Sequence, residues 1–310
     1  LLPPNLDGLS RDITLAFSAL NTEDRCFGTG WSISLCSLDL TNGRNILTLS
    51  DGRTFRCEVL PPKGQDLHFK DQKLKDFRVR RVDAKTFDVI NKDGVVERLS
   101  KAGGSVARLS LLRFPSGETF RFHHDHKVNG VSFLSKIVFL QTKQTYLKIT
   151  YQGAKAYAIS YPVDHGKTAR ILLSYQNDLL SSVSLPHDAS EDVGDGTALP
   201  RYTVSYVSLL GTFQAIQMLR RPTGAIETLQ YKEQGHKANG GGFIPHATLH
   251  TVMPGRHQPR IIKTYNFSQD RNFLGYESGK PEFVEGQDNL YLVQGNYTYE
   301  STEDVLKGDG

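Results

Sequence analysis

Two stretches in the middle of the chain, LKITYQGAKAYAISYP (147–162) and ILLSYQNDLLSSVSLP (171–186), decide the fold, because each has the pattern of a β-hairpin. In each, an alternating strand ends at Tyr-Gln, a short polar turn follows, and a second strand returns to a proline. Tyr151 of the first corresponds to Tyr175 of the second, and the closing prolines are separated by the same 24 residues. Because side chains alternate between the faces of a strand, this common phase predicts two copies of one hairpin in matching register.

Looser copies of this unit flank the pair, at TFRFHHDHKVNGVSFLSKIVFL (119–140) and YTVSYVSLLGTFQAIQML (202–219). A single hairpin is marginal in water, whereas stacked neighbours bury a continuous face. A true repeat therefore explains the pattern. The alternative is a β-meander whose hairpins resemble one another by chance.

Turn signals between β-rich runs continue the pattern along the chain. They are TNGR (41–44), SDGR (50–53), NKDG (91–94), PSGE (115–118) and RPTG (221–224). Helical periodicity is nearly absent. The sequence therefore predicts an all-β fold of serial antiparallel β-hairpins that form a curved sheet.

Three regions follow from these patterns. Residues 1–104 form an N-terminal hairpin region with the FGTGW turn, residues 105–232 hold the degenerate hairpin repeats, and residues 233–310 form an irregular loop region with closing strands. We expect them to be one continuous structural unit cut from a longer chain. The segments 186–200 and 233–245, rich in glycine and polar residues, are predicted to be exposed loops.

The stretch CFGTGWSISL (26–35) holds the only tryptophan of the chain. Gly28 and Gly30 permit backbone angles or close approaches that a Cβ would forbid. Trp31 then begins an alternating strand with two aliphatic residues on its face. We predict that Trp31 is a packing anchor. The alternative is an exposed ring that stacks on a ligand.

Composition excludes several classes of protein. The chain has 310 residues, a formal net charge of +4 and a pI near 8.8, with lysine and arginine spread along it, so nucleic-acid binding is not indicated. No apolar run approaches the ~18 residues of a membrane span, and this segment shows no signal peptide. Cys26, Cys36 and Cys57 lack metal-ligand spacing and are expected to be structural thiols, with one adventitious disulfide as the alternative.

The sequence HHDH (123–126) is the most tempting site for chemistry. On a strand, His124 and His126 would share a face and could bind a transition metal. The following HKVNG begins a turn, however, so a solvated hairpin end is the preferred interpretation. The acidic loop 186–200 lacks the spacing of a calcium-binding EF-hand. No cofactor site is predicted.

Two further motifs fail on spacing. HGKTA (165–169) resembles the end of a phosphate-binding loop, but Tyr161 stands where that loop requires glycine. GWSIS (30–34) resembles a nucleophile elbow, but Ser34 stands in the place of its second glycine. We therefore expect no enzymatic activity.

Three blocks, in order, resemble the Rhs/YD-repeat proteins, a family that includes toxin-complex-like and polymorphic toxin proteins of bacteria. They are DITLAFSALNTEDRCFGTGWSISL with LTLSDGRTFR, then LPRYTVSYVSLLGTFQAIQMLRRPTGAIETLQY, then the run from PGRHQP to YTYEST. The Tyr-Asp pair that names the repeat reads Tyr151-Gln152, Tyr175-Gln176 and Tyr206-Val207 here, so the repeats are degenerate.

The resemblance implies a structural role. YD-repeat proteins wind a long β-sheet into a hollow shell that encloses a C-terminal toxin domain, and this chain would be an arc of such a shell. Its implied partners are the remainder of its own polypeptide, including that toxin, and secretion or delivery proteins. The implied location is outside the producing cell or inside a target cell. A carbohydrate-binding or adhesive β-sheet module is the alternative, and a hydrolase is the least favoured.

Overall fold

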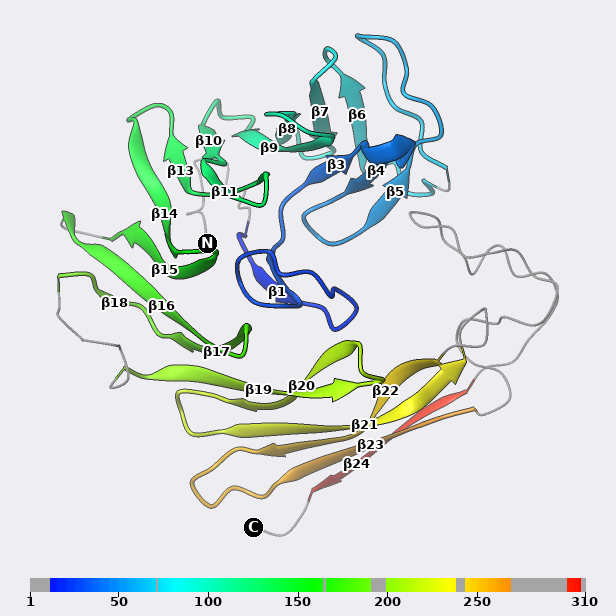
Figure 1. Ribbon diagram of the computed structural model, residues 1–310, viewed down its shortest axis with the longest axis vertical. Coiled ribbons are helices and arrows are strands. Elements are labelled where there is room, and N and C mark those ends of the chain that lie inside the picture. The colour runs from blue at the N-terminus through cyan, green and yellow to red at the C-terminus, as the bar shows by residue number, and fades with distance from the viewer. Residues whose placement is uncertain are drawn as a thin grey trace. The chain divides into compact units, whose positions relative to one another are not determined.

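The computed structural model describes residues 12–70, 72–163, 166–190, 199–237, 243–268 and 300–307, and strands make up nearly all of its regular structure (Figure 1). The strands are β1 (Leu15–Phe17), β2 (Trp31–Ile33), β3 (Ser37–Asp39), β4 (Ile46–Thr48), β5 (Thr54–Arg56), β6 (Phe77–Arg81), β7 (Thr86–Asn91), β8 (Val96–Ser100), β9 (Val106–Arg113), β10 (Thr119–His123), β11 (His126–Val128), β12 (Val131–Phe133), β13 (Lys136–Phe139), β14 (Gln144–Gln152), β15 (Lys155–Pro162), β16 (Thr168–Gln176), β17 (Leu179–Ser184), β18 (His187–Asp188), β19 (Arg201–Leu209), β20 (Phe213–Arg220), β21 (Ile226–Lys237), β22 (Phe243–Met253), β23 (Ile261–Phe267) and β24 (Ser301–Lys307). The described residues include the 3₁₀ turn η1 (Thr41–Gly43) and no α-helix. The predicted all-β fold, a long antiparallel sheet built from serial hairpins, is confirmed.

By its internal contacts the chain divides into two compact units. Of the described residues, unit 1 comprises those within 12–16 and 32–170, and unit 2 comprises those within 17–31 and 171–307. The change from unit 1 to unit 2 after Arg170 falls inside the predicted repeat region 105–232.

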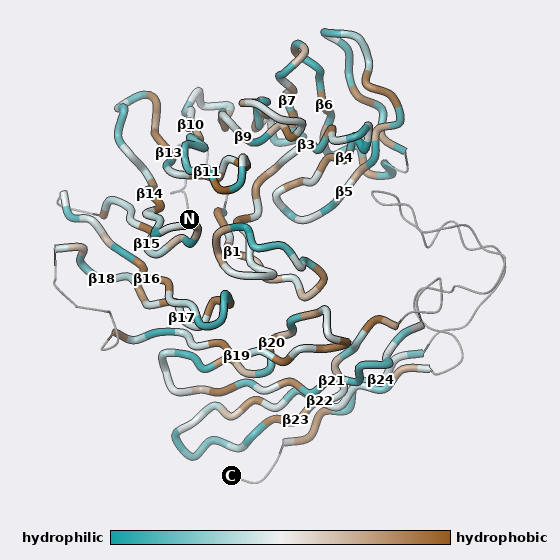
Figure 2. Tube along the Cα trace, in the orientation of Figure 1, coloured by the Kyte–Doolittle hydropathy of each residue, from teal (hydrophilic) through white to brown (hydrophobic). Residues whose placement is uncertain are grey.

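Unit 1 is built from hairpins that follow one another along the chain. Strands β6 to β10 pair in sequence order, β13, β14 and β15 continue the series, and β3 to β5 pair with one another and join through β3 to β9. Buried and less buried residues alternate along β7 and β8, and Phe87, Val89 and Leu99 are fully buried. Figure 2 shows this alternation of hydrophobic and hydrophilic positions along the strands. The core of unit 1 therefore follows from the period of two in its sequence.

The predicted turns lie where the sequence placed them. TFDVI and VVERL pair across NKDG as β7 and β8, with Gly94 at a φ of +82°. Gly52, Gly117 and Gly224 likewise have positive φ in the turns after β4, β9 and β20. Glycine suits these turns because it adopts the left-handed conformation without a steric penalty.

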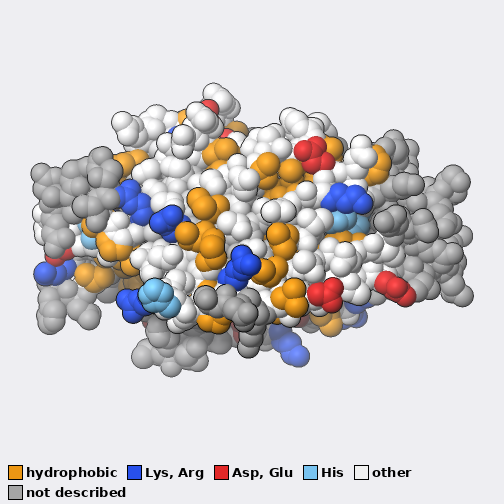
Figure 3. All heavy atoms as spheres, turned by 90° about the horizontal axis from the view of Figure 1, so that it is seen from below, with side chains coloured by type: hydrophobic (Ala, Val, Ile, Leu, Met, Phe, Trp, Pro, Cys, Tyr) orange, Lys and Arg blue, Asp and Glu red, His pale blue; other side chains and the backbone are white. Residues whose placement is uncertain are grey.

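Unit 2 continues the same construction. β16 pairs with β17, β17 with β19, and the strands from β19 to β24 then pair in sequence order. Leu173, Leu180 and Leu209 are buried, whereas most of β22 and β23 is half-buried. Val305 and Leu306 on β24 are exposed. In the view of Figure 3, hydrophobic side chains reach the surface among lysine, arginine and acidic side chains.

A β-bulge recurs beside a tyrosine in four hairpins. The register shifts immediately before Tyr151, Tyr175, Tyr206 and Tyr231, and each time the return strand carries one extra residue. In the first two hairpins the residues paired with the tyrosines are Ala156 and Leu180, again 24 residues apart. The matching register predicted for 147–161 and 171–185 is therefore confirmed.

Two expectations about loops are wrong in part. Within 233–245, residues up to 237 extend β21 and residues from 243 begin β22, and β22 and β23 replace the irregular region expected after Phe243. Within 186–200, His187–Asp188 form the short strand β18. The acidic residues at 191–198 and most of the predicted strand NYTYES lie outside the described residues. The described part of the chain holds no helix that is long and apolar enough to cross a membrane.

Candidate functional site: tyrosine and tryptophan anchors

Two of the four tyrosines beside the bulges bind the backbone of the preceding hairpin. Tyr206 Oη donates to the carbonyl of Leu180 at 2.7 Å, and Tyr231 Oη donates to the carbonyl of Ile216 at 2.6 Å. Leu180 is the residue paired with Tyr175, and Ile216 is the residue paired with Tyr206. Each tyrosine therefore binds the carbonyl beside the previous bulge, and one hydrogen bond recurs from hairpin to hairpin.

Tyr151 also binds a backbone carbonyl through its hydroxyl, in unit 1. Its hydroxyl donates to the carbonyl of Leu134, which lies just before β13. Its ring stacks on that of His126, with centroids 3.7 Å apart and an angle of 6° between the planes. Tyr151 thus connects β14 both to the chain before β13 and to the small β11–β12 hairpin.

Trp31 joins the tyrosine series in unit 2. Its ring is half-buried and lies 5.3 Å from the ring of Phe17, and its Nε1 donates to Tyr206 Oη at 2.7 Å. The Tyr206 hydroxyl therefore accepts from Trp31 and donates to Leu180. Burial raises the pKa of Tyr206 to about 12, although the bond from Trp31 opposes the rise. The tyrosine stays protonated and able to donate at physiological pH.

The two glycines before Trp31 allow its loop to pack closely. Gly28 has a φ of +87°, and a Cβ there would lie 2.7 Å from the backbone nitrogen of Leu180. Gly30 has a φ of +86°, and a Cβ there would lie 2.6 Å from the ring of Phe17. Both positions therefore require glycine for two reasons, the left-handed backbone and the lack of space.

Side chains and backbone groups hold this loop in place. Asp24 Oδ1 accepts from the backbone nitrogens of Cys26 and Gly28, at 2.9 and 3.1 Å. Cys26 itself has a φ of +71°, which is unusual for a residue other than glycine. Its carbonyl accepts from Tyr175 Oη at 3.4 Å. The predicted residues Gly28, Gly30, Trp31 and Tyr175 therefore lie together in unit 2, whereas Tyr151 lies in unit 1.

Tyr206→Phe removes one hydroxyl from this arrangement and is expected to lower the free energy of unfolding by about 1–3 kcal/mol. The reason is that Trp31 Nε1 and the Leu180 carbonyl lose their partner in a partly buried place. Urea melts would measure the loss, and the emission of Trp31 would report the local change. Tyr202→Phe, at an exposed position of the same strand, is the matched control. Equal effects of the two substitutions would contradict the assigned role.

The HHDH histidines are more buried than predicted. His124 lies in the short connection between β10 and β11, and burial, with Arg108 nearby, lowers its pKa to about 4. His126 lies on β11, and its Nε2 is buried without a hydrogen-bond partner among the described residues. The sequence predicts that this hairpin end is solvated. In the structure its histidines are instead packed, and His126 stacks on Tyr151. Within the described ranges no three His, Cys, Asp or Glu residues are grouped to hold a metal ion.

Chelation by EDTA is expected to leave the melting temperature unchanged, because no closed ligand set lies in the described part of the chain. Thermal melts of the metal-loaded and EDTA-treated protein test this. A clear drop with EDTA would instead identify a structural metal, since metal binding contributes directly to folding.

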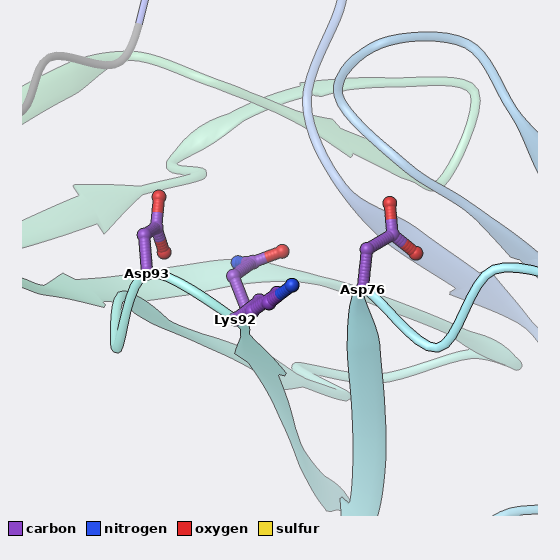
Figure 4. Close-up of a pocket in the computed structure, with 4 residues that line it drawn as sticks. Asp76, Lys92 and Asp93 are labelled. Atoms are coloured by element: carbon purple, nitrogen blue, oxygen red, sulfur yellow. The ribbon is translucent and has the colours of Figure 1, made fainter.

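An open pocket in unit 1 is lined by Asp76, Asn91, Lys92 and Asp93. Figure 4 shows Lys92 between the two aspartates. Asp76 Oδ2 binds the Arg53 guanidinium at 2.8 Å, and this bond lowers the pKa of the Asp76 carboxyl. Because Arg53 and Lys92 already supply positive charge, the pocket is poorly suited to bind a metal cation.

The three cysteines are buried, and none forms a disulfide. Burial, followed by the nearby Glu97 and Asp51 carboxylates, raises the pKa of the Cys36 thiol well above its ordinary value. Such a thiol stays protonated and is a poor nucleophile. These cysteines have the environment of small core residues.

The sequence pattern alone does not identify two members of the tyrosine series. Tyr206 has only a degenerate Tyr-Val pair, and Tyr231 lies in LQYKEQG, outside the hairpin copies found in the sequence. The available signal is an aromatic residue near the end of an alternating strand, 25 residues after Tyr206. Trp31 and Tyr206 are 175 residues apart, so no local sequence pattern indicates the hydrogen bond between them.

The chain matches no family model and no curated protein. Among solved structures, it is similar to the N-terminal domain of effector protein SpvB from Salmonella typhimurium, at 11% identity and a TM-score of 0.30, over 80% of this chain and 95% of that one. It is similar to TcdB2-TccC3-Cdc42 at 10% identity and a TM-score of 0.38, over 86% of this chain and 18% of that one. A porin-like protein from Bacteroides uniformis matches at 11% identity and a TM-score of 0.34, over 70% and 94%. Likenesses this weak carry no functional information.

Proposed function

We propose that this chain is a non-catalytic structural segment of a YD-repeat-type toxin shell. Together with the remainder of its polypeptide, it would enclose a C-terminal toxin domain. The observation that carries this proposal is the recurring unit of hairpin, bulge and tyrosine. A hairpin that binds the backbone of the hairpin before it can be added repeatedly, and a long continuous β-sheet can be built in this way.

The chemistry of the described residues supports a structural role. The groups with the largest pKa shifts, Cys36, His124 and Tyr206, are shifted mainly by burial. Tyr206 is also engaged in a hydrogen bond that holds two hairpins together. Such shifts are those of packed side chains, whereas catalytic groups are commonly shifted by charge partners within a cleft. The carbohydrate-binding alternative needs an exposed Trp31, and this ring is half-buried with its nitrogen bonded.

The proposal includes a location and partners. The assembled protein would be secreted or delivered into a target cell, with secretion or delivery proteins as partners. The enclosed toxin would be kept from solvent and protease until release. The sheet edges of an isolated segment would favour association unless later repeats cover them.

Limited proteolysis of the full-length gene product tests the proposal. We expect the C-terminal domain to survive within the whole protein and to be cut when expressed alone under the same conditions. A density map of the full-length protein should show later repeats that extend this sheet around a cavity. A self-closed domain here, with the remainder attached as a flexible tail, would overturn the proposal.

A further inference from the structure

A cluster of three rings connects β21, β22 and β23 in unit 2. The rings of His236 and His246 lie 4.7 Å apart, and Phe267 contacts both, at 4.9 and 4.4 Å between centroids. His246 Nδ1 is buried without a hydrogen-bond partner among the described residues. Two imidazoles thus share one largely apolar contact.

The cluster lies at an irregularity in the pairing of β21 with β22. The register shifts between Lys232 and His236, so that residues 233–235 of β21 lie opposite Pro245 alone. Proline cannot donate a ladder hydrogen bond, and this accounts for the irregularity. A Cβ on Gly235 would lie 2.7 Å from His246 Nδ1, so the imidazole packs against bare backbone. Beyond the irregularity His236 pairs with Ile244, and the ring contact packs this end of the hairpin against Phe267 of β23.

We propose that His236 and His246 form an acid-sensitive contact that holds the β21–β22 hairpin closed near neutral pH and releases it in mild acid. Protonation would place a positive charge in an apolar contact and, at the second ring, two like charges side by side. This inference does not rest on the proposed toxin shell.

Burial and nearby positive charge disfavour protonation of the two rings. Burial lowers the pKa of His236, and burial followed by the charges of His236 and Lys232 lowers the pKa of His246. On β21 the nearest carboxylate in sequence, Glu233, accepts from the backbone nitrogen of Leu210. Phe267, the residue of β23 that contacts both rings, is uncharged. On β22, His250 is paired with Glu227.

The sign of the pH effect follows from these shifts. Above the ordinary histidine pKa of about 6.5, both the closed and the opened hairpin hold neutral rings, so pH has no effect. As the pH falls below about 6.5, the opened form takes up protons that the closed form excludes. The closed form therefore loses stability until its own lowered pKa values are reached.

Hydrogen exchange of the 310-residue chain, corrected for the intrinsic rate, tests this between pH 7.5 and 5.0. Exchange of the paired amides in 229–237 and 243–250 should rise about tenfold or more relative to β7–β8, equivalent to about 1.4 kcal/mol. The double variant His236→Gln/His246→Gln should lose this dependence. His68→Gln, at an exposed position in unit 1, is the matched control and should keep it.

Two measurements keep the test decisive. NMR titration of the wild-type imidazoles needs no variant, and His236→Phe should shift the titration of His246 upward while keeping a ring against Phe267. An unchanged pH dependence in the double variant would overturn the proposal. So would an equal rise of exchange in β7–β8, which would mean general acid unfolding.

Discussion

Replacing Trp31 with alanine is expected to lower the free energy of unfolding by about 3–5 kcal/mol, the range for removing a large aromatic side chain from a packed site. The substitution removes the contact with Phe17 and leaves the Tyr206 hydroxyl without its donor. Urea melts followed by circular dichroism would measure the loss. Hydrogen exchange should show that β19 and β20 lose protection while β7 and β8 keep theirs.

Trp31→Phe is the matched variant. It keeps a ring beside Phe17 and removes the N–H donor, so its loss should be smaller, about 1–2 kcal/mol. A loss under about 1 kcal/mol for the alanine variant would contradict the packing role. It would favour an exposed ring, and with it the carbohydrate-binding alternative.

The sequence predicts those parts of this fold that depend on local pattern. The period of two along β7 and β8 identifies Phe87, Val89 and Leu99 as core residues, because alternate side chains of a strand share a face. The spacing of Tyr151 and Tyr175 predicts the register of two hairpins for the same reason.

Sequence composition gives a wrong prediction for part of 233–245, where pairing with other strands decides the structure. The glycine-rich run before Phe243 predicts an exposed loop from composition alone. In the structure a bulge absorbs Pro245, and β21 and β22 pair on both sides of it. Sequence composition cannot show this, because each strand is also stabilised by its second neighbour in the sheet. β21 pairs with β20, and β22 pairs with β23.

Contacts between distant segments were also beyond the sequence. The sequence predicts that Trp31 is an anchor, but its acceptor Tyr206 is 175 residues away. A loop and a hairpin this far apart in the sequence meet only in the tertiary structure, so no spacing rule connects them. The bulges that orient the tyrosines show no signature either, because a bulge adds one residue without changing the residue types.

Gly28→Ala is expected to destabilise unit 2 by about 2–5 kcal/mol, from a left-handed backbone and an overpacked contact together. The added Cβ would lie 2.7 Å from the nitrogen of Leu180 and 3.1 Å from the carbonyl oxygen of Asp178. Both are backbone atoms of the β16–β17 hairpin, so no side-chain rotation relieves the clash. The loop would have to withdraw, and Trp31 would move with it.

Gly224→Ala separates the two causes. Gly224 has a φ of +89°, nearly that of Gly28, but a Cβ there would meet nothing within 4 Å. The control should therefore lose only the conformational cost, about 1–2 kcal/mol. Urea melts of the two variants give the difference, which measures the close approach alone. Equal losses would show that the loop does not pack on the hairpin. A larger loss for Gly28, accompanied by a red shift of Trp31 emission, would show that the glycine and the tryptophan act together to hold the loop against the tyrosine series.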